Sequence, residues 1–311
     1  MTVHENLNSF AGKPVVDYKK TGDVRDFTTT APRLRCDYDD TFELRDFLAL
    51  MLDEPGAGAA QAIVFGAWTE NGESYQATPT GAIEMLVAKK DHLPDLTALF
   101  FGDIISEENE ISWIEQGDYS AIWAAFPRLE HFVARGGNSL RLGTINHSNL
   151  QRLVIEAGGL PLSVVRDALS ANAPIRHLEL WLGSDEYGGN TSVADFADLF
   201  AGKLFPDLHT LALRNSEYSD ALAEALAEAP ILDRIKVLDL SMGTISDKGV
   251  RALIGSGKLG RLEKLDISHH YASPEMVAEL SRATPNLVAD EPLTAEDEGD
   301  GEFYYYIAVS E

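Results

Sequence analysis

The stretch Leu208-His209-Thr210-Leu211-Ala212-Leu213 decides the fold, because its pattern L-x-x-L-x-L recurs along the chain. Clear copies start at residues 150, 175, 208, 235 and 262. Weaker copies start at residues 31, 60, 96 and 129, and a partial one starts at residue 287. Successive copies start 21 to 36 residues apart. Repetition at such a short spacing indicates that the same small structural unit is built again and again.

A period of this length with this leucine pattern is typical of a leucine-rich-repeat solenoid. The predicted fold is therefore α/β: a right-handed β-α superhelix, or horseshoe, with a parallel concave sheet and helices on the convex side. We expect one leucine-rich-repeat domain over residues 1–311. Residues 1–30 form an N-terminal cap that includes a short edge strand at 10–18, and 31–288 form about ten repeats. Residues 289–311 form an acidic loop and a C-terminal strand that folds back onto the last repeat.

A doubly wound nucleotide-binding domain also alternates strands with helices. Its strands are covered on both faces and are nearly continuously apolar, whereas polar residues interleave with the leucines here. The stretch Gly255–Gly260 matches G-x-G-x-x-G, but it follows a helix pattern and leads into a strand, the reverse of the dinucleotide motif. We therefore interpret it as a helix end and turn, and we favour the solenoid.

Between the strands, seven segments have helix patterns, and the one at Ser273-Pro274-Glu275 carries a strong start signal of cap, proline and acidic residue. The other six cover 42–52, 81–89, 162–169, 193–200, 221–229 and 247–254. Residues 136–143 have no helix pattern and are expected to be extended. In the long segment 103–118, Trp113 and Ile114 either plug the convex side or form an exposed contact.

The formal net charge of −25 argues against binding to nucleic acid or to an anionic membrane surface, both of which require basic residues. The first residues resemble no signal peptide, and no apolar run is long enough to span a bilayer. The single cysteine, Cys36, excludes an internal disulfide and is expected in the core. We therefore expect a cytoplasmic protein whose acidity favours a basic partner.

Side chains of a strand alternate between its two faces, so the residues between the leucines point to the open, concave face. Glu179, Asp239 and Asp266 are predicted to form one column, interrupted by Ala212. An adjacent column is predicted from Arg135, Glu156, Trp181 and Arg214, with Trp181 exposed. Val133 and Val154 are predicted on the same open face.

These residues are either ordinary solvated strand residues or a patch that binds a protein partner. Trp and Arg are favoured at the centres of protein interfaces. The candidate partner-binding residues are Arg135, Glu156, Glu179, Trp181, Tyr187, Arg214, Asp239, Asp266, His269 and His270. We predict no catalytic residue, no metal ligand and no cofactor.

Several segments resemble an uncharacterised family of bacterial cytoplasmic leucine-rich-repeat proteins with ribonuclease-inhibitor-like repeats. The segments are 10–17, 64–68, 110–116, 180–183 with 187–189, 211–217, 240–244, 269–271 and 306–309. Some members of that family are encoded beside radical-SAM-type proteins, which implies an accessory role. Where such repeats usually carry an asparagine, this chain has Gly137, Gly158, Gly183, Ser216, Gly243 and His270, so glycine geometry must make most of the turns.

The favoured hypothesis is a non-catalytic scaffold that binds a protein partner through the concave face and the loops at the strand ends. It predicts that Trp181→Ala and Arg214→Ala leave folding intact and abolish co-purification of the partner. The alternative is a ligand- or metal-binding accessory subunit of an enzyme system. That site would use Glu179, Asp239, Asp266, His269 and His270, because a pair of neighbouring histidines needs carboxylate partners to hold a metal.

Overall fold

The computed structural model describes residues 3–37, 40–68, 77–297 and 303–310. Their contacts divide them between two compact units. The N-terminal unit comprises residues 3–156 with 170–174, and the C-terminal unit comprises 157–169 with 175–310. The expectation of one domain over residues 1–311 stays a prediction.

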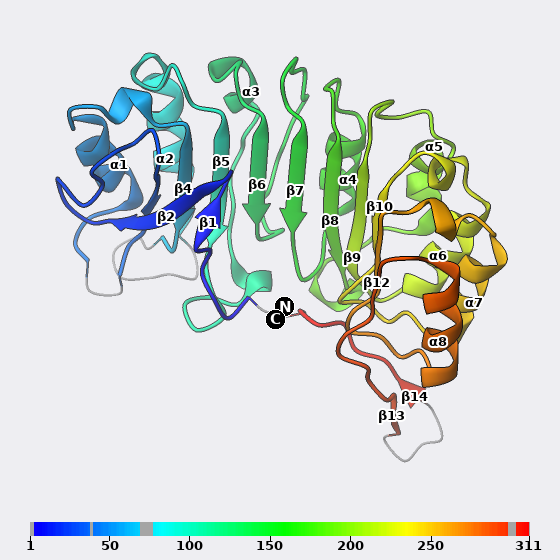
Figure 1. Ribbon diagram of the computed structural model, residues 1–311. Coiled ribbons are helices and arrows are strands. Elements are labelled where there is room, and N and C mark those ends of the chain that lie inside the picture. Colours follow the sequence, from blue (N-terminus) through cyan, green and yellow to red (C-terminus); the bar gives the residue numbers. More distant parts are fainter. Residues whose placement is uncertain (1–2, 38–39, 69–76, 298–302, 311) are drawn as a thin grey trace. The chain divides into compact units, whose positions relative to one another are not determined.

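In the N-terminal unit, seven described strands pair in sequence order, the first pair antiparallel and the others parallel (Figure 1). They are β1 (Ser9–Phe10), β2 (Lys13–Tyr18), β3 (Ala31–Leu34), β4 (Ala62–Gly66), β5 (Ala98–Asp103), β6 (His131–Arg135) and β7 (Arg152–Glu156). The helices of this unit are α1 (Leu44–Leu52), α2 (Thr80–Ala88) and α3 (Ile122–Ala125), with short 3-10 turns at Ala57–Ala59, Lys90–His92 and Ile111–Trp113. The expected strand at residues 10–18 is confirmed as the hairpin β1–β2.

In the C-terminal unit, five strands also pair in sequence order, and all of them are parallel. They are β8 (His177–Gly183), β9 (Thr210–Ser216), β10 (Val237–Asp239), β11 (Lys264–Asp266) and β12 (Leu287–Val288). The helices between them are α4 (Leu162–Leu169), α5 (Ala197–Phe200), α6 (Ser219–Glu228), α7 (Asp247–Gly255) and α8 (Pro274–Ala283). The 3-10 turns are Asp185–Tyr187, Val193–Phe196, Pro230–Asp233 and Leu259–Arg261. Helices α6, α7 and α8 pack against one another in order (Figure 1). The chain is a mixed α/β protein with mostly parallel strands.

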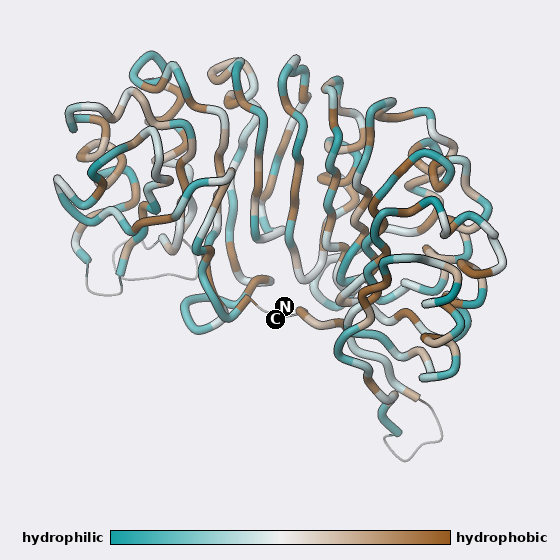
Figure 2. The backbone as a smooth tube through the Cα atoms, viewed as in Figure 1, coloured by the Kyte–Doolittle hydropathy of each residue, from teal (hydrophilic) through white to brown (hydrophobic). Residues whose placement is uncertain are grey.

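The leucines of the repeated pattern form the core of this unit. Leu208, Leu211 and Leu213 are at most 2% exposed, and their counterparts in the neighbouring strands are equally buried. Figure 2 shows the hydrophobic stretches that follow the strands. Burying a leucine side chain stabilises a protein by about 1.5–3 kcal/mol. Repetition of the leucines therefore sets both the period of the strands and their register.

The expected helices are confirmed with small shifts of their ends. Helix α8 begins as its sequence indicates, because the Ser273 Oγ accepts a hydrogen bond from the Met276 N–H and Pro274 is the first helical residue. Residues 193–200, expected as one helix, form a 3-10 turn followed by the short α5. Residues 136–143 contain no helix, and Cys36 is buried, both as expected.

The strand face of the N-terminal unit differs from the expected open face. Val133 and Val154 are 6% and 1% exposed and belong to an apolar cluster with Phe100 and Phe10. The rings of Phe10 and Phe100 lie 5.9 Å apart, and Leu7 packs on the same cluster. The N-terminal segment thus covers this face, because alanine, valine and phenylalanine here replace the polar residues of an open one.

The expected acidic loop after residue 288 lies partly outside the described residues. Its described part contains β13 (Glu296–Asp297), which pairs antiparallel with β14 (Phe303–Tyr304). The segment after β14 folds back along the strand ends of the C-terminal unit.

Candidate functional site

The register of β8 to β11 brings the predicted acidic residues side by side. Glu179 and Asp239 both pair with Ala212 of β9, and Asp239 pairs with Asp266. This confirms the column of Glu179, Asp239 and Asp266 interrupted by Ala212. One position along the same face, Trp181 pairs with Arg214. The six residues Glu179, Trp181, Arg214, Asp239, Ser241 and Asp266 are called the polar row below.

Arg214 is the centre of the polar row. Its Nη1 donates a hydrogen bond to the Glu179 Oε1 at 2.9 Å, and its Nε donates to the Ser241 Oγ at 3.0 Å. The same Nε lies 3.5 Å from the Asp239 Oδ2. The guanidinium carbon is 5.1 Å from the centre of the Trp181 ring, a distance suited to a cation–π contact. One cation therefore joins three neighbouring strands.

Trp181 is 6% exposed, so the prediction of an exposed tryptophan is wrong. Its indole N–H donates to the Glu179 Oε1 at 2.9 Å, and the Arg214 guanidinium lies over its ring. The guanidinium covers the ring and the carboxylate contacts its N–H edge, and both reduce the exposure of the side chain. A buried tryptophan contributes several kcal/mol to stability, so the expectation that Trp181→Ala leaves folding intact no longer holds.

Burial acts on both carboxylates beside Arg214, but with opposite net results. Burial opposes ionisation of Glu179, yet the hydrogen bond from His177, the Arg214 charge and the Trp181 N–H hold its pKa well below the usual value. Burial raises the pKa of Asp239, and the Arg214 charge only partly offsets this. Arg214 thus stabilises the ionised form of Glu179 more than that of Asp239.

Asp266 lies at one end of the polar row, and His177 lies beside Glu179 at the other end. The Lys264 Nζ donates to the Asp266 Oδ2 at 2.9 Å, and this contact lowers the pKa of Asp266 against the opposing effect of burial. The His177 Nε2 lies 3.0 Å from the Glu179 Oε2. Every carboxylate of the row is therefore engaged by a cationic or hydrogen-bonding group of the same unit.

The two neighbouring histidines have different surroundings. His270 is 1% exposed, with its Nε2 3.3 Å from the Ala289 carbonyl oxygen and its Nδ1 accepting from the Ala272 N–H. Burial lowers the pKa of His270. The His270 side chain thus binds the backbone of its loop, at a position where leucine-rich repeats usually carry an asparagine. The sequence had predicted that glycine geometry makes most of these turns. Among the described residues, no three His, Cys, Asp or Glu side chains are placed to hold a metal ion.

His269 belongs to a row of left-handed residues at the strand ends. Asn215 near the end of β9 is equivalent in register to Met242 after β10 and His269 after β11, and their φ values are 53°, 67° and 61°. Left-handed backbone is uncommon for residues other than glycine, and asparagine tolerates it best. Three equivalent residues in this conformation give the loops a common shape.

The C-terminal segment 306–309 lies along these three residues. The His269 Nε2 is 3.0 Å from the Tyr306 carbonyl oxygen, and the Ala308 N–H donates to the Met242 carbonyl oxygen at 2.8 Å. The Val309 N–H donates to the Asn215 Oδ1 at 3.0 Å, and the Asn215 Nδ2 donates back to the Val309 carbonyl oxygen. The sequence predicted that this segment folds back, but not that it reaches as far as β9.

Glycine makes the turn at the end of β8, as predicted. Gly183 has φ of 70°, and a Cβ added there would lie 1.8 Å from the Gly158 carbonyl oxygen. Tyr187 lies in the 3-10 turn beyond it, half-buried, and its carbonyl oxygen faces Gly159. Tyr187 is therefore part of a close backbone packing, and its hydroxyl remains a candidate contact.

Arg135 and Glu156 belong to the N-terminal unit. The Arg135 Nε donates to the Glu156 Oε2 at 2.6 Å, and its Nη1 donates to the Ile104 carbonyl oxygen. Asp103, which is fully buried, pairs with Arg33 at 2.8 Å and lies 3.9 Å from Arg135. The predicted column that joins Arg135 and Glu156 to Trp181 and Arg214 stays a prediction, because the two pairs lie in different units.

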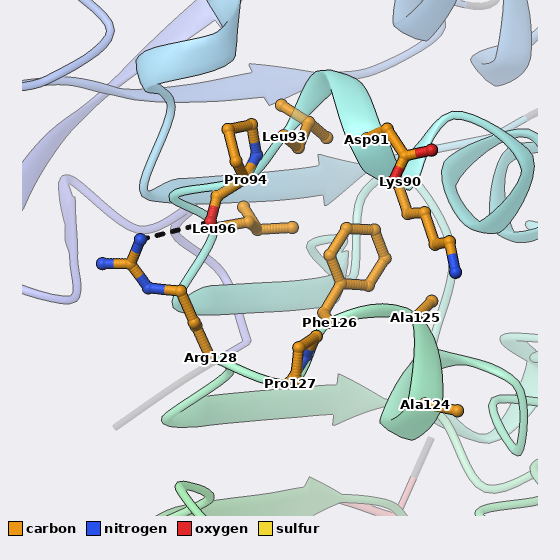
Figure 3. Close-up of a pocket in the computed structure, with 10 residues that line it drawn as sticks. All are labelled: Lys90, Asp91, Leu93, Pro94, Leu96, Ala124, Ala125, Phe126, Pro127 and Arg128. Carbon is orange, nitrogen blue, oxygen red and sulfur yellow. Dashed lines mark hydrogen bonds between the residues drawn. The ribbon is translucent and has the colours of Figure 1, made fainter.

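The N-terminal unit contains several cavities. One of 320 Å³ lies beside α3, where the Arg128 Nη1 donates to the Pro94 carbonyl oxygen (Figure 3). Phe126 and Leu96 line its apolar part. A second, of 430 Å³, is lined by residues 106–110 and Trp113. Trp113 is 55% exposed, whereas Ile114 is fully buried, so only Ile114 acts as the expected plug.

Comparison with known proteins gives matches among solved structures. No protein-family model matches the chain, and no curated protein matches its sequence. The chain is similar to the crystal structure of a protein from Bacteroides fragilis, a target of the Northeast Structural Genomics Consortium. The sequences are 30% identical and the TM-score is 0.77, over 89% of this chain and 76% of that chain. In the part of the chain that the structure describes, no helix is both long and apolar enough to cross a membrane.

Proposed function

We propose that this chain, which belongs to the same protein family as the Bacteroides fragilis protein, is a non-catalytic protein-binding scaffold of the leucine-rich-repeat type. The parallel order of the strands and the burial of the repeated leucines support the repeat assignment. Repeat proteins of this kind offer extended binding surfaces made from the same position of successive strands.

The observation that carries the proposal is the internal pairing of the polar row. Glu179, Asp239 and Asp266 each contact Arg214 or Lys264, so none of the three is a free general base or metal ligand. Side chains that are already held in place lose little entropy when a partner binds, which favours a rigid interface. The arrangement thus fits binding better than the alternative ligand or metal site.

The more accessible side chains lie beside the two ends of the polar row. The side chain of Lys264 is 44% exposed and that of His177 is 21% exposed, whereas Arg214 and Glu179 are 11% and 9% exposed. We therefore infer that Lys264 and His177 touch the partner and that Trp181 and Arg214 support the surface from below. A cytoplasmic location, which the sequence features predict, belongs to this proposal. An accessory role beside radical-SAM-type proteins also belongs to it, and this role rests on the family resemblance alone.

The test is affinity purification of the tagged chain from its native cells, followed by mass spectrometry. The variant combines Lys264→Ala with His177→Ala. The control is Lys248→Ala in α7, which also removes a lysine paired with a carboxylate, here Glu224 at 3.1 Å. We expect the variant to lose partners that the control retains, with unchanged circular dichroism. Identical partner sets for both proteins would overturn the proposal.

A further inference from the structure

We propose that the loop after β5 in the N-terminal unit forms a second site, which receives the arginine side chain of a partner protein. The site is the 430 Å³ cavity lined by Ser106, Glu107, Glu108, Asn109, Glu110 and Trp113. Cavities of a few hundred Å³ are of the size that holds small ligands or single side chains. This inference is independent of the polar row, which lies in the other unit.

Trp113 supplies the aromatic surface. It is the exposed one of the four tryptophans, since Trp68, Trp123 and Trp181 are 4%, 3% and 6% exposed. The loop holds Trp113 firmly, because the Asn109 Nδ2 donates to its carbonyl oxygen and the Trp113 N–H donates to the Glu110 carbonyl oxygen. A large aromatic side chain thus stays in solvent on an ordered turn, where a guanidinium can stack on it.

The carboxylates give the cavity its charge. Glu108 is paired with Arg35, and the Glu107 Oε1 lies 3.6 Å from the Nδ1 of His4, which is itself exposed. The Glu110 side chain is exposed and has no hydrogen bond or ion pair among the described residues. Glu110 is therefore available to a cation from outside, and a carboxylate beside an aromatic ring suits the planar fork of an arginine.

Asn109 gives the second, independent indication of a ligand. It lines the cavity and is 8% exposed, and its Oδ1 accepts no hydrogen bond within the described parts of the chain. A buried carbonyl oxygen without a donor is costly, and it is usually satisfied by a ligand or a bound water. A guanidinium has five N–H donors and no acceptor, so it matches an unsatisfied oxygen beside carboxylates.

The experiment uses the full chain labelled with ¹⁵N on the tryptophan indoles, whose Trp113 resonance is assigned with Trp113→Phe. The probe is Nα-acetyl-arginine amide, and the neutral isostere Nα-acetyl-citrulline amide is the matched control ligand. We expect a saturable shift of the Trp113 resonance with the arginine probe only. Lysine amide should bind more weakly, because a point charge cannot stack or pair bidentately.

Two variants, measured by ligand-observed NMR, locate the site. Glu110→Gln should weaken binding about threefold, as for one exposed ion pair, and Trp113→Ala should weaken it about two- to fivefold, as for one exposed cation–π contact. The control Glu275→Gln makes the same charge change at an exposed position in α8. The proposal fails if the Trp113 resonance stays in place, if citrulline shifts it equally, or if Glu275→Gln weakens binding as much as Glu110→Gln. Such a failure leaves the scaffold proposal and its co-purification test untouched.

Discussion

Replacing Arg214 by methionine tests whether this guanidinium holds the polar row together. The change keeps a long apolar side chain over Trp181 but leaves the Glu179 carboxylate without its cation. The two side chains are 11% and 9% exposed, so solvent screens their interaction little. Removing one partner of a buried ion pair costs about 3–5 kcal/mol. We expect about 3 kcal/mol, the lower end of that range, because Trp181 and His177 still contact Glu179.

Urea denaturation followed by circular dichroism measures this loss, and a double-mutant cycle with Glu179→Gln isolates the pair. Because both charges are then absent, the double variant should be more stable than the sum of the single losses predicts, by about 2 kcal/mol. A loss below about 1 kcal/mol for Arg214→Met, or strict additivity in the cycle, would refute the reasoning.

The same cycle has a pH dependence whose sign follows from Glu179. The folded-state pKa of Glu179 is depressed, so its ionised form stabilises the folded protein above its unfolded value of about 4.5. That stability is lost as the pH falls below this value toward the folded-state pKa. Without Arg214, the folded-state pKa of Glu179 is lowered less. The stability gap between the wild type and Arg214→Met should therefore be widest at neutral pH and narrow below pH about 4.5.

Three further predictions concern the turns and caps. Gly183→Ala should destabilise the chain by more than about 3 kcal/mol, because its Cβ would collide with backbone at 1.8 Å. Asn215→Ala should speed hydrogen exchange at the Val309 amide at least tenfold, whereas equal exchange in wild type and variant would contradict the assigned contact. Ser273→Ala should cost about 1 kcal/mol in urea denaturation through loss of the helix cap, and no measurable loss would show that the cap is dispensable.

The strand order and the acidic column were predictable because they follow from the repeat. Once the leucines align successive strands, the positions between them align as well, and this places Glu179 beside Ala212 and Asp239 beside Asp266. The alternation of residues along a strand predicts the face of the sheet to which each side chain points. It does not state what else covers that face.

The burial of Trp181 therefore could not be predicted from the alternation along the strand, because it depends on the direction in which the Arg214 side chain extends. The covered face of the N-terminal unit did carry a signal: Val64, Phe100 and Val133 are apolar where an open face would be polar. The contact of Asn215 with Val309 joins residues 94 positions apart, and no local periodicity reports such a contact.

The segment 306–309 has a consequence for how the C-terminal unit comes apart. In an array of repeats, each repeat contacts only its neighbours, so repeats can unfold one at a time from the end of the array. Here a single strand-end segment is bonded at His269, Met242 and Asn215 in turn. Unfolding of the repeat that contains β11 therefore requires detachment of the segment 306–309, which also contacts β9. The segment 306–309 therefore couples the unfolding of three successive repeats. The C-terminal unit should unfold cooperatively rather than one repeat at a time.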